Sequence, residues 1–200
     1  TNPAGSSAIP NQGSGIDIIN ASTNSIGLAG QGNIISANGS RGIFIQNGAN
    51  TVRGNIIGLD ITGTVVVGSG NLSAGIDLMN CSGNIIGGID GIITGDRNII
   101  GGNGSGIIIA EPITTANQII VNIIGTDEGG TLHLGNAEAG ILITNQAYGN
   151  TIGGLTPAHG NVIANNGGPG ILSTELGTTG NVFRRNRVYG NVSKGIRLDN

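Results

Sequence analysis

The sequence predicts an all-β chain wound into a solenoid, and three observations support this fold class. The chain has 40 Gly in 200 residues, with 10% charged and 2% aromatic residues, a composition that fits neither disorder nor collagen. A Gly-Ile pair recurs along the whole chain, and two short strands led by Asn lie between successive pairs. A pattern that recurs every roughly 20 to 50 residues decides the fold of such a chain.

The Gly-Ile pair begins a short alternating strand in each repeat. Its Ile is predicted to face inward, because alternate residues of a strand face opposite sides and this position is always Ile. We therefore expect a core ladder of Ile16, Ile43, Ile76, Ile107, Ile141, Ile171 and Ile196. The repeats predict a single solenoid domain over residues 1–200, with coils that start near 15, 42, 75, 106, 140, 170 and 195.

Asn recurs in three columns, one before each strand of a coil. Asn tolerates the left-handed backbone of a bend, and stacked side-chain amides can hydrogen-bond along the solenoid axis. Four of these residues lie in N-x-S patterns, but the columns persist where that pattern is absent, which favours a structural role. The columns are Asn11, Asn38, Asn71, Asn103, Asn136, Asn166, Asn191; Asn24, Asn50, Asn84, Asn117, Asn150, Asn181; and Asn33, Asn55, Asn98, Asn122, Asn161, Asn186.

Three strands per coil, stacked at about 4.8 Å, predict a rod on the order of 30 Å long. The motifs GNTIGG (149–154), GNVIANN (160–166), IGLDITGT (57–64) and IGTDEGGT (124–131) occur within the repeats. With these motifs the chain resembles right-handed parallel β-helix proteins of pectin-lyase-like fold. It is most similar to the Asn-rich repeat arrays of secreted bacterial and archaeal surface proteins. The resemblance implies a right-handed parallel β-helix in an extracellular or cell-surface location.

The first 16 residues align with residues 126–141 at equal length. Asn2 falls on Asp127, and the Gly-Ile pairs coincide. We therefore expect residues 1–16 to be the second half of a coil with a long loop, and the chain to be a segment of a longer array. Asp60 and Asp127 occupy equivalent places in the two other long loops, where we expect them to stabilise turns; cation binding is the lesser alternative.

In five successive coils, the middle residue of the third strand is apolar. Strand parity places them on the outer face, where such a surface usually marks a contact between molecules. The alternatives are that long loops cover these side chains, or that the parity is shifted by one residue. The predicted assembly surface, called the apolar column below, consists of Ile34, Ile56, Ile99, Ile123 and Val162.

Charge is distributed unevenly along the chain. Residues 1–183 carry three basic and ten acidic side chains, whereas residues 184–200 carry five basic and one acidic. The basic end is interpreted either as a solubilising cap or as a surface that docks head to tail on an acidic neighbour or an adjoining domain. The basic cluster consists of Arg184, Arg185, Arg187, Lys194 and Arg197.

The sequence contains few candidate catalytic residues. Asp17 and Asp77 are predicted to face outward from the first strand, but Phe44 separates them and the nearest basic residue in that column is Arg197. His133 and His159 are isolated, and the sequence has no catalytic triad pattern, Cys/His metal spacing or phosphate loop. The sequence therefore predicts no enzymatic activity, no cofactor and no metal.

Other classes of partner are disfavoured by composition. The net charge of −3 argues against nucleic acid, and the sequence has no apolar run of the roughly 18 residues needed to span a membrane. The single Cys81 cannot form an internal disulfide.

The sequence is best interpreted as that of a non-catalytic structural or adhesive protein. It would form a rigid rod or filament segment that associates with itself laterally or head to tail, or with adjoining domains, and surface polysaccharide is a further possible partner. The alternative function is a carbohydrate-binding or polysaccharide-degrading domain, because this fold hosts many such sites.

Overall fold

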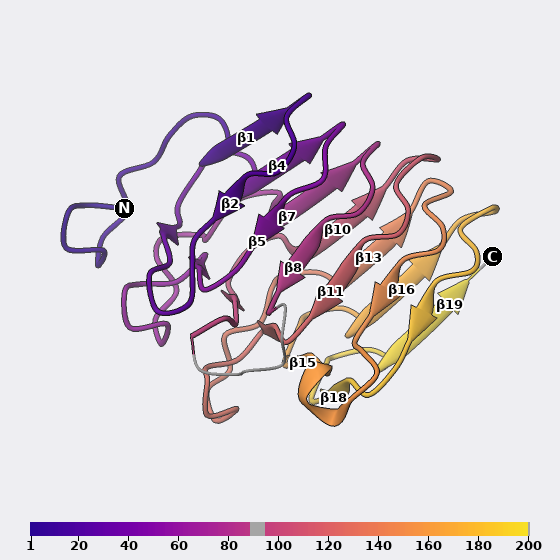
Figure 1. The fold of residues 1–200 in the computed structure, drawn as a ribbon. Helices are drawn as coiled ribbons and strands as arrows, with labels where there is room; N and C mark the ends of the chain where they lie inside the picture. Colours follow the sequence, from indigo (N-terminus) through magenta and orange to yellow (C-terminus); the bar gives the residue numbers. More distant parts are fainter. Residues whose placement is uncertain (89–94, 200) are drawn as a thin grey trace.

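The computed structural model describes residues 1–88 and 95–199 and consists of three parallel sheets stacked into a rod (Figure 1). The first sheet contains β1 (Ile16–Ile19), β4 (Ile43–Gln46), β7 (Ala74–Met79), β10 (Ser105–Ala110), β13 (Ile141–Thr144), β16 (Ile171–Thr174) and β19 (Ile196–Asp199). The second contains β2 (Ser25–Ile26), β5 (Thr51–Val52), β8 (Ile85–Gly87), β11 (Gln118–Ile120), β14 (Thr151–Ile152) and β17 (Val182–Phe183). The third contains β3 (Ile34–Ile35), β6 (Ile56–Ile57), β9 (Ile99–Ile100), β12 (Ile123–Ile124), β15 (Val162–Ala164) and β18 (Arg187–Tyr189).

Each strand pairs in parallel with the equivalent strands of the adjacent coils. The coil therefore contributes one strand to every sheet, as the repeats predict, and the chain is a parallel β-helix. A 3-10 turn, η1 (Pro157–His159), precedes β15. The N-terminal and C-terminal coils lie at opposite ends of the rod (Figure 1).

The predicted Ile ladder lies in one register along the first sheet. Its five central members are completely buried, whereas Ile196 in the last coil is 44% exposed. The glycine before each Ile is required by the close approach of the next coil. A Cβ added to Gly75 would lie 2.7 Å from the carbonyl oxygen of Gly106 and 2.8 Å from Cγ2 of Ile100.

The three Asn columns form hydrogen-bonded ladders, as predicted. In the middle of the rod, the backbone N–H and the Nδ2 of Asn84 both donate to Oδ1 of Asn117, each at 2.9 Å. Asn117 donates in the same way to Asn150 in the next coil. Every ladder has this direction: the donor lies on the coil nearer the N-terminus, and the acceptor lies on the coil nearer the C-terminus.

The expectation that the ladder Asn residues themselves adopt the left-handed backbone is wrong. The residue immediately before the ladder Asn has the positive φ in most bends, for example 62° at Val121 before Asn122. Glycine often occupies this earlier position, as at Gly83 before Asn84, because it adopts positive φ without steric cost. The preceding residue thus turns the chain, and the Asn side chain then bonds to the next coil.

Asp127 and Asp60 each close their own long loop with a carboxylate. Oδ1 of Asp127 accepts backbone N–H bonds from the residues four and five places later, both at 2.6 Å. Asp60 accepts bonds at the same two offsets, both at 3.1 Å, and the amide oxygen of Asn2 does so at 2.8 and 3.1 Å. The predicted turn-stabilising role is confirmed, and the loop at the start of residues 1–16 is held in the same way as the loop of 126–141.

Candidate functional site

The apolar column lies on the outer face of the third sheet, as strand parity predicts. Ile34, Ile56 and Ile99 line an open hollow of about 330 Å³, called the apolar hollow below. Val162 lies farther along the same sheet, while Ile123 between them is only 1% exposed. The five residues therefore do not form one continuous exposed surface.

Loops lie against part of this column. The N–H of Ile61, in the long loop after β6, donates to the carbonyl oxygen of Gly5 at 3.1 Å. A Cβ placed on Gly5 would lie 3.0 Å from Cδ1 of Ile34, and one on Gly63 would lie 3.3 Å from Cδ1 of Ile99. The column is thus the floor of a groove bordered by loops rather than a projecting ridge.

A second hollow adjoins the first and is lined by arginines. It has a volume of about 250 Å³, and its lining includes Arg97, Arg185, Arg187, Gly160 and Val162; we call it the arginine hollow. Arg97 lines both hollows.

The predicted basic cluster did not include Arg97. Arg97 and Arg185 are far apart in sequence, but each comes directly before an Asn of the third ladder, so the coils place them in one column. That shared position before a ladder Asn is the sequence signal that could have found it.

The five predicted basic residues do not form a single cluster. Arg185 and Arg187 are exposed on the side of the third sheet, whereas Lys194 lies in the bend before β19. Arg197 lies on β19 in the first sheet, and its Nε is 2.5 Å from Oδ2 of Asp199. Arg184 is half-buried, and its Nε has no hydrogen-bond partner among the described residues.

The environment of Asp77 differs from the one that the sequence predicts. The residue is only 3% exposed, and Nε of Arg41 lies 2.5 Å from its Oδ2, so the carboxylate has a basic partner that the strand column did not reveal. Arg41 comes from the bend before β4, and its guanidinium also lies 4.6 Å from the ring centroid of Phe44. Burial raises the pKa of Asp77 despite the hydrogen bond and charge of Arg41. Asp17, two coils away, is exposed and is not part of this pair.

The remaining reactive side chains are dispersed. Cys81 is buried, and burial raises the pKa of its thiol to about 12. His133 is exposed in a long loop, and His159 is half-buried in η1. Within residues 1–88 and 95–199, no group of three or more His, Cys, Asp or Glu is placed to hold a metal ion. Of the helical segments that the structure describes, none has the length and hydrophobicity to cross a membrane.

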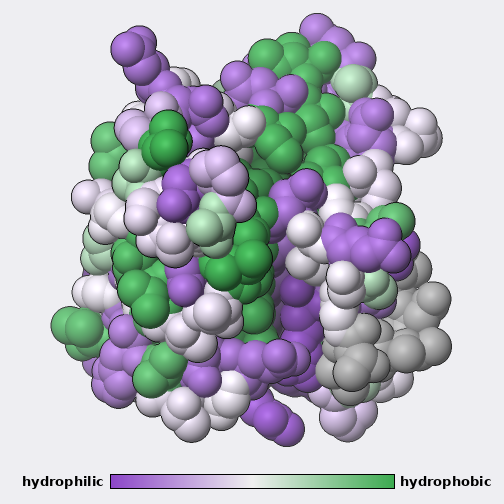
Figure 2. All heavy atoms as spheres, turned by 90° about the vertical axis from the view of Figure 1, so that its left-hand side faces the viewer, coloured by the Kyte–Doolittle hydropathy of each residue, from purple (hydrophilic) through white to green (hydrophobic). Residues whose placement is uncertain are grey.

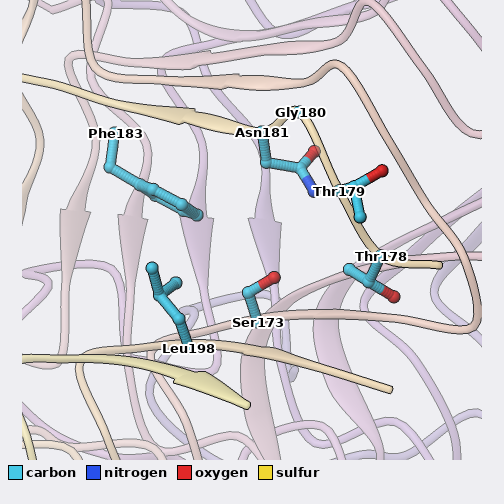
Figure 3. A pocket seen from close by; sticks show the side chains of 7 residues that line it. All are labelled: Ser173, Thr178, Thr179, Gly180, Asn181, Phe183 and Leu198. Atoms are coloured by element: carbon cyan, nitrogen blue, oxygen red, sulfur yellow. The ribbon is translucent and has the colours of Figure 1, made fainter. Parts of the chain in front are cut away.

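The C-terminal end of the rod is open. A pocket of about 160 Å³ lies between β16, β17 and β19. Phe183 and Leu198 form one side of this pocket, and Thr178, Thr179 and Asn181 lie on the other (Figure 3). Leu198 is 60% exposed, although it is the register equivalent of inward-facing residues in the earlier coils.

The N-terminal end is more closed. Of the inward-facing residues of the first coil, Ile18, Ile26 and Ile35 are only 6–8% exposed and Ile16 is partly buried. The view of this side shows hydrophobic groups gathered in a band through the middle, bordered by hydrophilic groups (Figure 2). The two ends therefore present different surfaces.

Comparisons with protein-family models, curated proteins and solved structures return no match for the chain.

Proposed function

We propose that the protein is a non-catalytic structural rod of an extracellular or cell-surface protein, and that its end coils stack head to tail on further coils, which for the 200-residue chain are those of a second copy. The direction of the Asn ladders carries this proposal. A rod with one-way ladders has unlike ends, one with hydrogen-bond acceptors and one with donors. Such ends fit each other head to tail.

The first coil supplies the acceptors. Asn11, Asn24 and Asn33 donate to the second coil, while their own Oδ1 atoms accept no hydrogen bond from the described residues. The last coil supplies the donors. Oδ1 of Asn181, Asn186 and Asn191 each accepts from the preceding coil, while their backbone N–H groups have no acceptor among the described residues. Stacking one end on the other would continue all three ladders.

Apolar burial and charge support the same arrangement. The C-terminal pocket exposes Phe183 and Leu198, whose burial by a neighbouring coil would be favourable at about 25 cal/mol per Å² of apolar surface. The C-terminal segment is basic, whereas the first coil carries Asp17 as its one charged side chain and the coils behind it are acidic. Charges so distributed orient an encounter more than they strengthen the final complex.

Sedimentation velocity over a range of concentrations, together with electron microscopy, tests the proposal. We expect linear head-to-tail oligomers of the 200-residue chain, and we expect Leu198→Lys to abolish them because a charge would be buried in the contact. The matched control is Leu72→Lys. Leu72 is 61% exposed, as Leu198 is 60% exposed, but it lies in the bend before β7, which has a coil on either side.

Charge-reversal variants measure the electrostatic contribution to association. Changing Arg184, Arg185 and Arg187 to Glu should slow association at low salt, with a smaller effect at high salt because ions screen the charges. A chain that stays monomeric at every concentration would show the proposal to be wrong, as would equal loss of oligomers in Leu198→Lys and Leu72→Lys.

A further inference from the structure

We propose that the arginine hollow is a binding site for a doubly charged oxyanion, that is, a phosphate or sulfate group. This proposal does not rest on the rod function: the hollow opens on the outer face of the third sheet, although two of its arginines belong to the terminal coil. The inference rests on the placement of three arginines around one hollow, on a described lining without acidic side chains and on an unpaired donor of Arg97.

Three arginines from distant parts of the sequence line one hollow. Arg97 reaches it from the coil of β9, and Arg185 and Arg187 reach it from the coil of β18. A guanidinium group offers several N–H donors in a planar fork, which matches the oxygens of phosphate or sulfate and can bind two of them at once. A group that sits between these arginines is therefore bound from both ends of the hollow.

Gly160 allows the coils to approach closely beside this hollow. A Cβ on Gly160 would lie 2.0 Å from the carbonyl oxygen of Arg185 in the next coil, so this position must be glycine. Ala158 and Val162 are neighbours that also line the hollow. The glycine thus lets the coil that carries Arg185 and Arg187 stack directly on its own coil.

The charges in the hollow are uncompensated by the described residues. Its described lining contains three arginines and no Asp or Glu, and Glu128 lines only the adjoining apolar hollow. The ion pairs found within residues 1–88 and 95–199 involve none of these arginines.

Arg97 in addition has an unsatisfied donor. Its Nε is buried and has no hydrogen-bond partner among the described residues, although buried polar groups in native structures nearly always have one. An oxyanion bound by the guanidinium group would compensate the charge of this partly buried side chain.

Isothermal titration calorimetry of the intact chain with sodium sulfate and sodium phosphate tests the site, with sodium chloride at equal ionic strength as the reference. We expect saturable binding of both oxyanions and none of chloride. Arg97→Gln and Arg187→Gln should each weaken binding about tenfold or more, because each removes a charge-assisted contact. Arg187 is exposed, so its variant tests the site even if Arg97→Gln disturbs the fold.

Lys194→Gln is the matched control. It removes one positive charge from the same end of the chain but does not line the hollow, so it should change the affinity by less than about twofold. Equal weakening in Lys194→Gln, or no binding of sulfate and phosphate beyond that of chloride, would overturn the proposal.

Titration with a phosphate ester distinguishes a site for the free anion from a site for a phosphate group on a larger molecule. Glucose 6-phosphate should bind as well as inorganic phosphate if the site takes a phosphate group carried by a larger molecule. Binding of inorganic phosphate alone would assign the hollow to the free ion. In both cases the arginine variants must weaken the binding, and if they do not, the site lies elsewhere.

Discussion

At the scale of single residues, the buried ladder Asn is the side chain on which the bends depend. Asn98 is completely buried; its Oδ1 accepts from the backbone N–H and Nδ2 of Asn55, and its Nδ2 donates to Val52 and Asn122. Asn98→Ala leaves several of these buried groups without partners. We expect a loss of about 2–4 kcal/mol in the free energy of unfolding, measured by urea denaturation.

The control for this variant is Asn24→Ala. Asn24 belongs to the second ladder but is exposed in the first coil, where water can replace the lost bonds. We expect it to cost less than about 1 kcal/mol. Equal losses in the two variants would mean that burial of the ladder amide does not determine its contribution.

The pKa of Asp127 tests whether its carboxylate accepts the hydrogen bonds that close the long loop. Hydrogen bonds from the backbone of Leu132 and Thr131 and from the Thr131 and Thr126 side chains lower its pKa from 3.8 to about 2. A carboxyl with a lowered pKa in the folded state stabilises that state above its unfolded pKa, and this stabilisation is lost as the pH falls through the folded value. We expect the Asp127 carboxyl carbon to titrate by NMR with a midpoint near 2. A midpoint near 4 would show that the turn does not form as described.

At the scale of elements, Arg41 joins the bend before β4 to the outer face of β7 through Asp77. Arg41→Met leaves the Asp77 carboxylate buried without its partner, which should cost about 2 kcal/mol at pH 7. The folded-state pKa of Asp77 is already raised by burial, and it should rise further without Arg41. The loss should therefore be smaller at pH 4 than at pH 7, because Asp77 then takes up a proton in the folded state. Urea denaturation at the two pH values measures the difference.

Two further variants make this prediction specific. Adding Asp77→Leu to Arg41→Met should recover most of the loss, because no unpaired charge remains. Arg197→Met removes a pair in which both side chains are largely exposed, so it should cost less than about 1 kcal/mol. A loss in Arg41→Met that does not change with pH would contradict the account.

The elements themselves were predictable from the sequence to different degrees. The Gly-Ile repeat and the Asn columns gave the three sheets and their register, because identical positions must stack on one another in a solenoid. The Arg41–Asp77 pair was not predictable from strand columns, since Arg41 comes from a bend and its long side chain crosses to the next coil. The cover over the apolar column depends on the path of the loops, which the repeat does not specify.

At the scale of the whole molecule, the rod is a linear array in which each coil contacts only its neighbours. The central coils are held from both sides, whereas an end coil is held from one. We expect the strands of residues 95–152 to exchange their amide hydrogens most slowly and residues 181–199 most rapidly, because local opening is easiest where fewest contacts must break. Hydrogen exchange measured by mass spectrometry resolves these segments.

The same measurement distinguishes a free rod from a stacked one. Head-to-tail contact converts an end coil into an interior coil, so raising the protein concentration should slow exchange in residues 181–199 and 24–35 and leave residues 95–152 unchanged. Leu198→Lys should keep the exchange at both ends fast at every concentration, whereas Leu72→Lys should behave like the parent chain. If exchange slows equally along the whole rod, or along the third sheet instead of the ends, the copies associate side by side and the ladder directions do not determine the assembly.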